Sequence, residues 1–135
     1  MATEPIFIGD VVGQITTIGV INTVTTVYTG DAAKPVRVDS ICVVNNDSVE
    51  HTMKVYMNDG TTDHLLATVA VPADAGTLGG SASYNLLCSS ELVPFSHQDN
   101  AANTFMDLPK NWSIKAELTT ALTNGVDVFM QGGTY

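Results

Sequence analysis

Residues 111–120 read NWSIKAELTT, and apolar and polar side chains alternate along this stretch. Successive side chains of a β-strand point to opposite faces, so the alternation predicts a strand with one buried row and one solvated row. The expected buried row consists of Trp112, Ile114, Ala116 and Leu118. No helical stripe of useful length competes with this pattern elsewhere, so the stretch decides the fold class.

The same alternation recurs along the chain and indicates an all-β fold. It predicts two more buried rows, Met53, Val55 and Met57 in one and Val126, Val128 and Met130 in the other. Further strand candidates, separated by turn-forming residues, lie at 14–20, 22–30, 36–46, 64–71 and 83–90. Many short strands at near-regular spacing predict a single antiparallel β-sandwich or jelly-roll-like domain over residues 21–135. Residues 1–20 are expected to form an N-terminal arm or a first strand.

Composition excludes several classes of function. The 135 residues include 5 Lys and Arg against 14 Asp and Glu, which gives a formal net charge of −9. Such a chain repels a phosphate backbone, so nucleic-acid binding is not expected. No apolar run approaches the roughly 20 residues that span a membrane, and the N-terminal residues lack the features of a signal peptide. We therefore expect assembly in a cytoplasm and no membrane partner.

Two cysteines, Cys42 and Cys88, are too few for a disulfide scaffold. Free cysteine behaves as a small apolar residue, so buried free thiols are the favoured interpretation. A disulfide between them stays open at this point.

The segment NDGTTDH, residues 58–64, has two interpretations. Asp59, Asp63 and His64 are residue types that could bind a metal ion or transfer a proton. A calcium loop would need oxygen ligands at alternate positions and a closing Glu, and zinc would need further His or Cys residues nearby. Asn-Asp-Gly between alternating runs is instead a hairpin signal. We predict a connection of about four to six residues between Met57 and Leu65, with Gly60 in the turn.

A second segment contains Ser96, His97 and Asp99, the residue types of a hydrolase triad. Adjacent residues on one extended segment point in different directions, and the chain has no Gly-x-Ser-x-Gly motif. His51 lies beside Glu50 in a polar stretch and is expected to be solvated. We therefore expect no enzymatic activity, no metal site and no cofactor.

Apolar residues outside the expected core are more informative. Near the N-terminus they are concentrated at Ile6, Phe7, Ile8, Val11 and Val12. This run could be a first strand of the sandwich or an arm that packs against a neighbouring subunit. Phe129 alternates with the buried row of its strand and is expected to face outward. These six residues are the candidate partner contacts.

Residues 36–46, VRVDSICVVNN, are apolar on both expected faces. Alternation places Val36, Val38, Cys42 and Val44 on one face, and Ile41 and Val43 on the other. Strands of this kind are usually covered on both sides. Either a loop of the same chain or a second subunit could supply the cover.

Four stretches carry a resemblance to small β-sandwich structural proteins of tailed bacteriophages: ICVVNND (41–47), KVYMNDG (54–60), LLATVAVPA (65–73) and LPKNWSIKAEL (108–118). The resemblance covers roughly residues 25–131. It departs from the family pattern at Asn111, where Gly or Asp usually begins the last hairpin. It implies a non-enzymatic virion component, most concretely a capsid decoration (cement) protein. The implied partners are the major capsid protein or another virion protein, and further copies of the chain, often as trimers.

The resemblance leaves an alternative within the virion. The chain could be a head–tail, neck or tail-fibre-associated module, including one that binds carbohydrate. Sugar binding needs exposed aromatic rings, and the single tryptophan, Trp112, is expected to face inward. That expectation favours decoration of the capsid.

Overall fold

The computed structural model describes residues 9–77, 82–98, 104–120 and 122–135. These residues form an all-β fold with the strands β1 (Val11–Ile18), β2 (Thr25–Tyr28), β3 (Val36–Asn45), β4 (His51–Asn58), β5 (Asp63–Val71), β6 (Tyr84–Asn85), β7 (His97–Gln98), β8 (Thr104–Leu108), β9 (Ser113–Leu118) and β10 (Val126–Thr134). Two short 3-10 helices separate β6 from β7, namely η1 (Leu86–Cys88) and η2 (Val93–Phe95). The 3-10 helix η1 interrupts the strand that was predicted at 83–90.

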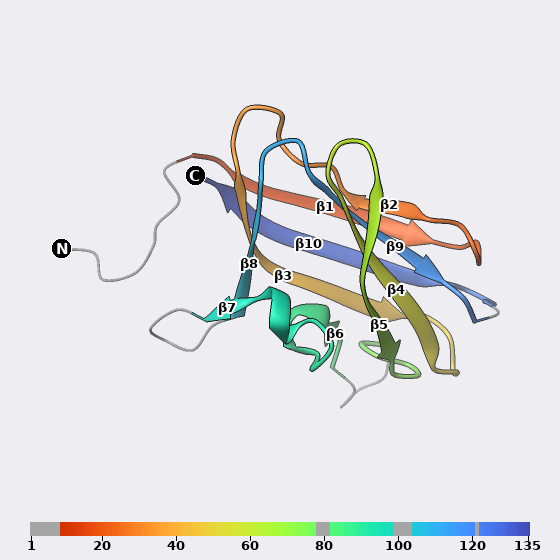
Figure 1. Cartoon of the computed structure of the whole chain (residues 1–135). Coiled ribbons are helices and arrows are strands. Elements are labelled where there is room, and N and C mark those ends of the chain that lie inside the picture. Colours follow the sequence, from red (N-terminus) through yellow and green to blue (C-terminus); the bar gives the residue numbers. More distant parts are fainter. Residues whose placement is uncertain (1–8, 78–81, 99–103, 121) are drawn as a thin grey trace.

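The strands form two sheets packed face to face (Figure 1). One sheet has the order β1-β10-β3-β8-β7, with β6 also paired to β3, and the other has the order β2-β9-β4-β5. The described pairings are antiparallel. The predicted antiparallel β-sandwich is therefore confirmed, whereas the more specific jelly-roll arrangement stays a prediction.

The core lies between the two sheets and contains the predicted rows. The row of β4 and the row of β10 are buried, as are Ile114, Ala116 and Leu118 of β9. Trp112 precedes β9 and is half-buried against the core. Complete burial of one such aliphatic side chain contributes about 1.5–3 kcal/mol, so these rows dominate the stability of the sandwich.

β3 changes the face that it buries partway along its length. Its register with β10 skips Asp39, which marks a β-bulge next to Val38. The bulge reverses the alternation, so the buried apolar residues of β3 are Val36, Val38, Ile41 and Val43. The prediction that Cys42 and Val44 share a face with Val36 and Val38 is therefore wrong. Cys42 and Val44 lie on the outer face, where both are half-buried.

A close backbone approach accompanies this bulge. Gly132 of β10 pairs with Val38, and a Cβ atom at position 132 would lie 2.0 Å from the carbonyl oxygen of Arg37. Glycine is the residue that permits this contact. The outer face near Val44 is covered by the same chain, since a Cβ atom on Gly76 would lie 3.3 Å from Val44 Cγ2. A loop thus supplies at least part of the cover expected for β3.

Both cysteines are free thiols, but only part of the prediction for them is right. Cys42 is half-buried and Cys88 is exposed. The expected burial therefore fails for Cys88, which follows the two buried leucines of η1. None of the helices that the described ranges contain is both long and apolar enough to cross a membrane.

The first and last strands lie side by side at one edge of the sandwich (Figure 1). The N–H of Thr134 donates to the carbonyl oxygen of Asp10 at 2.8 Å, and the N–H of Asp10 donates to Thr134 Oγ1 at 2.8 Å. Residues 11–18 thus form a first strand of this sandwich. Ile6, Phe7 and Ile8 lie outside the described residues.

Candidate interaction surface

The segment NDGTTDH forms the connection of the β4–β5 hairpin, as predicted, with four residues between the strands. Asp59 accepts hydrogen bonds from the N–H groups of Thr61 and Thr62 at 3.1 and 2.9 Å. Gly60 has a φ of +99°, a conformation that favours glycine. His64 Nε2 lies 3.1 Å from Asp59 Oδ2.

The carboxylates of this hairpin have partners within the hairpin and on the neighbouring strand β9. The hydrogen bonds from Thr62, His64 and Thr61 lower the pKa of Asp59. The hydrogen bond from the Asn58 amide, at 2.7 Å, and the ion pair with Lys115 Nζ, at 3.2 Å, lower the pKa of Asp63. The described parts of the chain bring together no group of three or more His, Cys, Asp or Glu residues that could hold a metal ion. The segment functions as a turn.

Ser96 and His97 have separate partners. Ser96 Oγ donates to the carbonyl oxygen of Val93 at 2.9 Å and closes η2. The His97 ring lies against Phe105, with 5.5 Å between the ring centroids, and the Arg37 guanidinium stacks on the same Phe105 ring. Asp99 lies outside the described residues. The segment that resembles a triad in composition therefore packs against β8 through an aromatic contact.

His51 contradicts the prediction of a solvated side chain. It begins β4 and is fully buried, with Nε2 2.8 Å from Asp47 Oδ2. Burial raises the pKa of Asp47, but the hydrogen bonds from the N–H of Asn124, from His51 and from two further N–H groups outweigh it and lower that pKa to about 2. His51 Nδ1 has no hydrogen-bond partner. We refer to Asn45, Asp47 and His51 as the polar knot.

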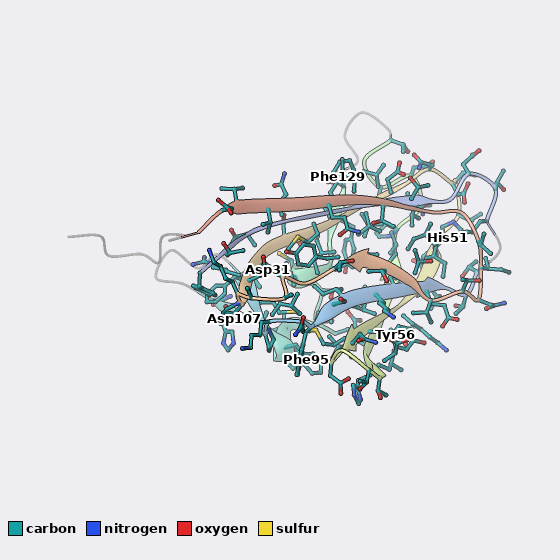
Figure 2. The ribbon with its side chains drawn as sticks, turned by 90° about the horizontal axis from the view of Figure 1, so that it is seen from above. Asp31, His51, Tyr56, Phe95, Asp107 and Phe129 are labelled. Carbon is teal, nitrogen blue, oxygen red and sulfur yellow. The ribbon has the colours of Figure 1, made fainter. Side chains whose placement is uncertain are left out.

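The polar knot ties three loops together at one end of the sandwich, where Figure 2 shows His51. The Asp47 carboxylate accepts hydrogen bonds from the N–H groups of residues 123, 124 and 125. The Asn45 amide donates to the carbonyl oxygens of Val49 and Pro72 at 2.9 and 3.0 Å. Because its carboxylate is buried and engaged in several hydrogen bonds, the polar knot holds the fold together and offers no reactive group to solvent.

The outer face of β1 and β10 carries exposed apolar side chains. Val11 is 81% exposed, Ile15 is 67% exposed and Phe129 is 36% exposed. Ile15 and Phe129 are direct cross-strand partners, and Figure 2 shows Phe129 next to β1. We call these three side chains the β1/β10 patch. Two of its members, Val11 and Phe129, belong to the predicted contacts, whereas Val12 points inward and packs against the core.

β1 carries apolar residues on both of its faces. Val12 and the fully buried Ile18 point inward together with the half-buried Gln14 and Thr16, whereas Val11 and Ile15 point outward. Gln14 Oε1 accepts a hydrogen bond from the N–H of Thr29 at 3.1 Å, and Thr16 Oγ1 donates to the carbonyl oxygen of Thr26 at 3.5 Å. The outer face of a surface strand in a monomeric sandwich is normally polar, so the exposed Val11 and Ile15 are the unusual feature of β1. Sequence analysis did not single out Ile15, because the alternation of β1 does not show which of its two partly apolar faces points outward.

Two shallow hollows adjoin the β1/β10 patch and meet at Gly13. One, of about 390 Å³, is lined by Val11, Val12, Gly13, Asp39, Gln131 and Gly132. The other, of about 420 Å³, is lined by Gly13, Gln14, Ile15, Phe129, Met130 and Gln131. The missing side chain at Gly13 leaves a gap in the outward row, with Val11 and Ile15 on either side.

A separate apolar hollow of about 370 Å³ opens between the sheets. It is lined by Met57, His64, Leu66, Phe95, Met106, Asp107 and Trp112. Phe95 is 44% exposed, and Figure 2 shows it with Asp107 on the side of the molecule away from β1. Asp107 accepts a hydrogen bond from the Tyr135 hydroxyl, and burial together with this bond raises the pKa of Tyr135 to about 12.

The chain matches no protein-family model. Comparisons with curated proteins and with solved structures also found no significant match. The resemblance to phage β-sandwich proteins therefore stays a prediction from the sequence. Function has to be argued from the surfaces of this chain, because a β-sandwich by itself serves many unrelated functions.

Proposed function

We propose that this chain is a structural component of a phage virion, most concretely a capsid decoration protein, and that it attaches through the β1/β10 patch. The single observation that carries the proposal is the apolar outer face of β1, with Val11 81% and Ile15 67% exposed. Exposing an apolar row while turning Gln14 and Thr16 inward favours association over a free monomer. The major capsid protein, or another virion protein, is the partner that the sequence resemblance implies.

Attachment of this kind would stabilise a shell through burial of apolar surface. Each square ångström of apolar surface removed from water contributes roughly 25 cal/mol, so one small patch gives a weak contact. A shell offers many equivalent sites, and a copy that spans a boundary between capsid subunits opposes their separation. The net charge of −9 opposes non-specific aggregation of copies that are not yet attached.

Electrostatics define the expected partner surface. An acidic chain binds best where an apolar centre is surrounded by Lys and Arg side chains. Asp39 lines the hollow beside Val11, and Asp127 lies at the other end of β10 with Thr17 Oγ1 2.6 Å from its carboxylate. We therefore expect an apolar partner patch with basic residues at its rim, and binding that weakens as salt concentration rises.

The test is binding of purified protein to undecorated shells of the virion that carries it. Wild-type protein should co-sediment in hundreds of copies per particle and raise the temperature at which the shell opens. Ile15→Asp should abolish both effects. Leu65→Asp, a matched change at a 53% exposed apolar residue on β5, should abolish neither. Equal loss of binding in both variants, or only a few copies in the intact virion, would overturn the proposal.

The second candidate function is a carbohydrate-binding module of a tail fibre. The hollow between the sheets favours it, because Phe95 and Trp112 place two aromatic rings beside Asp107 and His64. Aromatic faces with nearby hydrogen-bonding groups suit a sugar ring. Binding of the isolated chain to a glycan array, lost in Phe95→Ala and kept in Ile15→Asp, would favour this module over the decoration protein.

A further inference from the structure

We infer that two copies of this chain form a dimer in which their β1 strands pair with each other in antiparallel orientation. A twofold axis relates the two copies, and the pairing joins their larger sheets into one continuous sheet. This inference goes beyond the proposed function, because it does not depend on which particle the chain belongs to. It follows from the backbone of β1, from the absence of charge along it, and from the gap at Gly13.

The backbone of β1 has one side free for pairing. β1 ends the strand order of its sheet, so β10 is its neighbour on one side only. The N–H of Thr134 donates to the carbonyl oxygen of Asp10 in the same register that pairs Val11 with Gly133. Antiparallel strands alternate between hydrogen-bonded and non-bonded pairs. The N–H and C=O groups of four residues therefore point away from β10, those of Val11, Gly13, Ile15 and Thr17.

β1 lacks the features by which other edge strands of this sandwich avoid pairing. β7 has two residues, and β2 has four residues with an interruption in its register. β5 also has an interrupted register, and it begins with the charged Asp63. β1 pairs with β10 over eight residues without interruption and contains neither a charged residue nor a proline. Bulges, charges and short length protect edges, so β1 is the unprotected edge.

Charge also favours β1 as the place where two copies meet. A formal net charge of −9 makes two copies repel each other over most of their surfaces. The sequence of β1, VVGQITTI, contains no carboxylate, so the centre of the junction is uncharged, and the neighbouring Asp10 and Asp127 lie at its ends. Uncharged strands can approach to hydrogen-bonding distance without the cost of placing like charges opposite each other.

The gap at Gly13 defines the register. An antiparallel pair that uses all four outward-facing residues places Val11 opposite Thr17 of the second copy and Gly13 opposite Ile15 of the second copy. The side chain of that second Ile15 then lies over Gly13, where the two hollows meet. The twofold axis repeats the contact, so each Ile15 fills the gap of the other copy, as a self-complementary interface requires.

Pairing at this edge extends the outer face. Directly paired residues of neighbouring strands point their side chains to the same face of a sheet. The β1/β10 patches of the two copies would therefore join into one apolar surface on one side of the dimer. A shell could bind this doubled patch more tightly than either half, so the dimer would also assist the proposed attachment.

The first measurement is the mass of the free full-length chain by sedimentation equilibrium, without shells. We expect twice the 14.2 kDa of one chain. Ile15→Lys should give a monomer, because it places two positive charges close to each other across the twofold axis. The circular dichroism spectrum should not change. Leu65→Lys, the matched control on β5, should stay a dimer. A monomeric wild-type chain, or a dimer that survives Ile15→Lys, would overturn the inference.

The register has its own test by disulfide cross-linking. In a Cys42→Ser/Cys88→Ser background, Val11→Cys combined with Thr17→Cys should give a covalent dimer under mild oxidation, because directly opposed strand residues lie within disulfide reach. Val11→Cys alone should not, since the two copies of position 11 would lie roughly 20 Å apart. Equal cross-linking in both variants would rule out this register. A wild-type chain that is monomeric but still binds shells would overturn the dimer and leave the proposed function in place.

Discussion

The polar knot and the β1/β10 patch both reverse the usual distribution of residues, but in opposite ways. The polar knot buries His51, Asn45 and Asp47, and the chain itself supplies almost all of their hydrogen bonds. The patch exposes Val11 and Ile15, and no described residue covers them. Buried polar groups with internal partners stabilise a fold, whereas exposed apolar groups without internal cover suit a partner. The difference separates residues that hold the sandwich together from residues that are available for binding.

The largest effect should come from removing the centre of the polar knot. Asp47→Ala leaves His51 and three backbone N–H groups buried without their acceptor. We expect the free energy of unfolding to fall by about 3–5 kcal/mol, the range for breaking a buried charged network. Urea denaturation measures this loss. Asp63→Ala, at the exposed hairpin, is the control and should lower the free energy of unfolding far less, because exposed ion pairs contribute little to stability. Similar losses in the two variants would show that the knot is not a special site of stability.

Acid should weaken the polar knot in a defined pH window. The pKa of Asp47 is lowered from 3.8 to about 2 in the folded protein. A group whose folded pKa is depressed contributes stability above its unfolded pKa and loses that contribution as pH falls through its folded pKa. The melting temperature should therefore decline between pH 4 and pH 2 more steeply in the wild type than in Asp47→Asn. Parallel declines would indicate that other carboxylates govern the acid response.

The hairpin turn between β4 and β5 should show an intermediate effect. Gly60 has a φ of +99°, which a β-branched residue adopts only with strain. We expect Gly60→Val to lower the free energy of unfolding by about 1–3 kcal/mol. Gly60→Asn should cost less, because asparagine tolerates a positive φ better than valine. Chemical denaturation of the two variants gives the comparison, and a smaller loss for valine than for asparagine would contradict the strain argument.

Local patterns predicted the parts of the fold that depend on local chemistry. The alternation of 111–120 identified the buried row of β9, and Asn-Asp-Gly identified the β4–β5 turn. Each of these features depends on a few consecutive residues. The buried face of β3 was predicted wrongly because the alternation changes at the bulge at Asp39, which lies opposite Gly132, a residue distant in sequence.

The polar knot and the outward orientation of Ile15 depend on distant partners in the same way. The sequence predicted a solvated His51 in a polar stretch. In the structure His51 contacts Asp47, whose carboxylate accepts hydrogen bonds from the N–H groups of the distant residues 123–125. Ile15 appeared to be one apolar residue of an ordinary strand, and only pairing with β10 showed that it faces outward. In both cases the residue types were visible, but the sequence did not contain the orientation.

The smallest effect on stability should come from the β1/β10 patch, and it sharpens the comparison most. Ile15 is 67% exposed, so Ile15→Lys removes little buried surface and should change the free energy of unfolding of the monomer by no more than about 0.5 kcal/mol. The same substitution should abolish association, because an ammonium group would replace the side chain proposed to fill the gap at Gly13. Denaturation of dilute protein and sedimentation of concentrated protein measure the two quantities separately. A large loss of monomer stability would mean that Ile15 belongs to the fold, as His51 does, and the distinction between the two regions would fail.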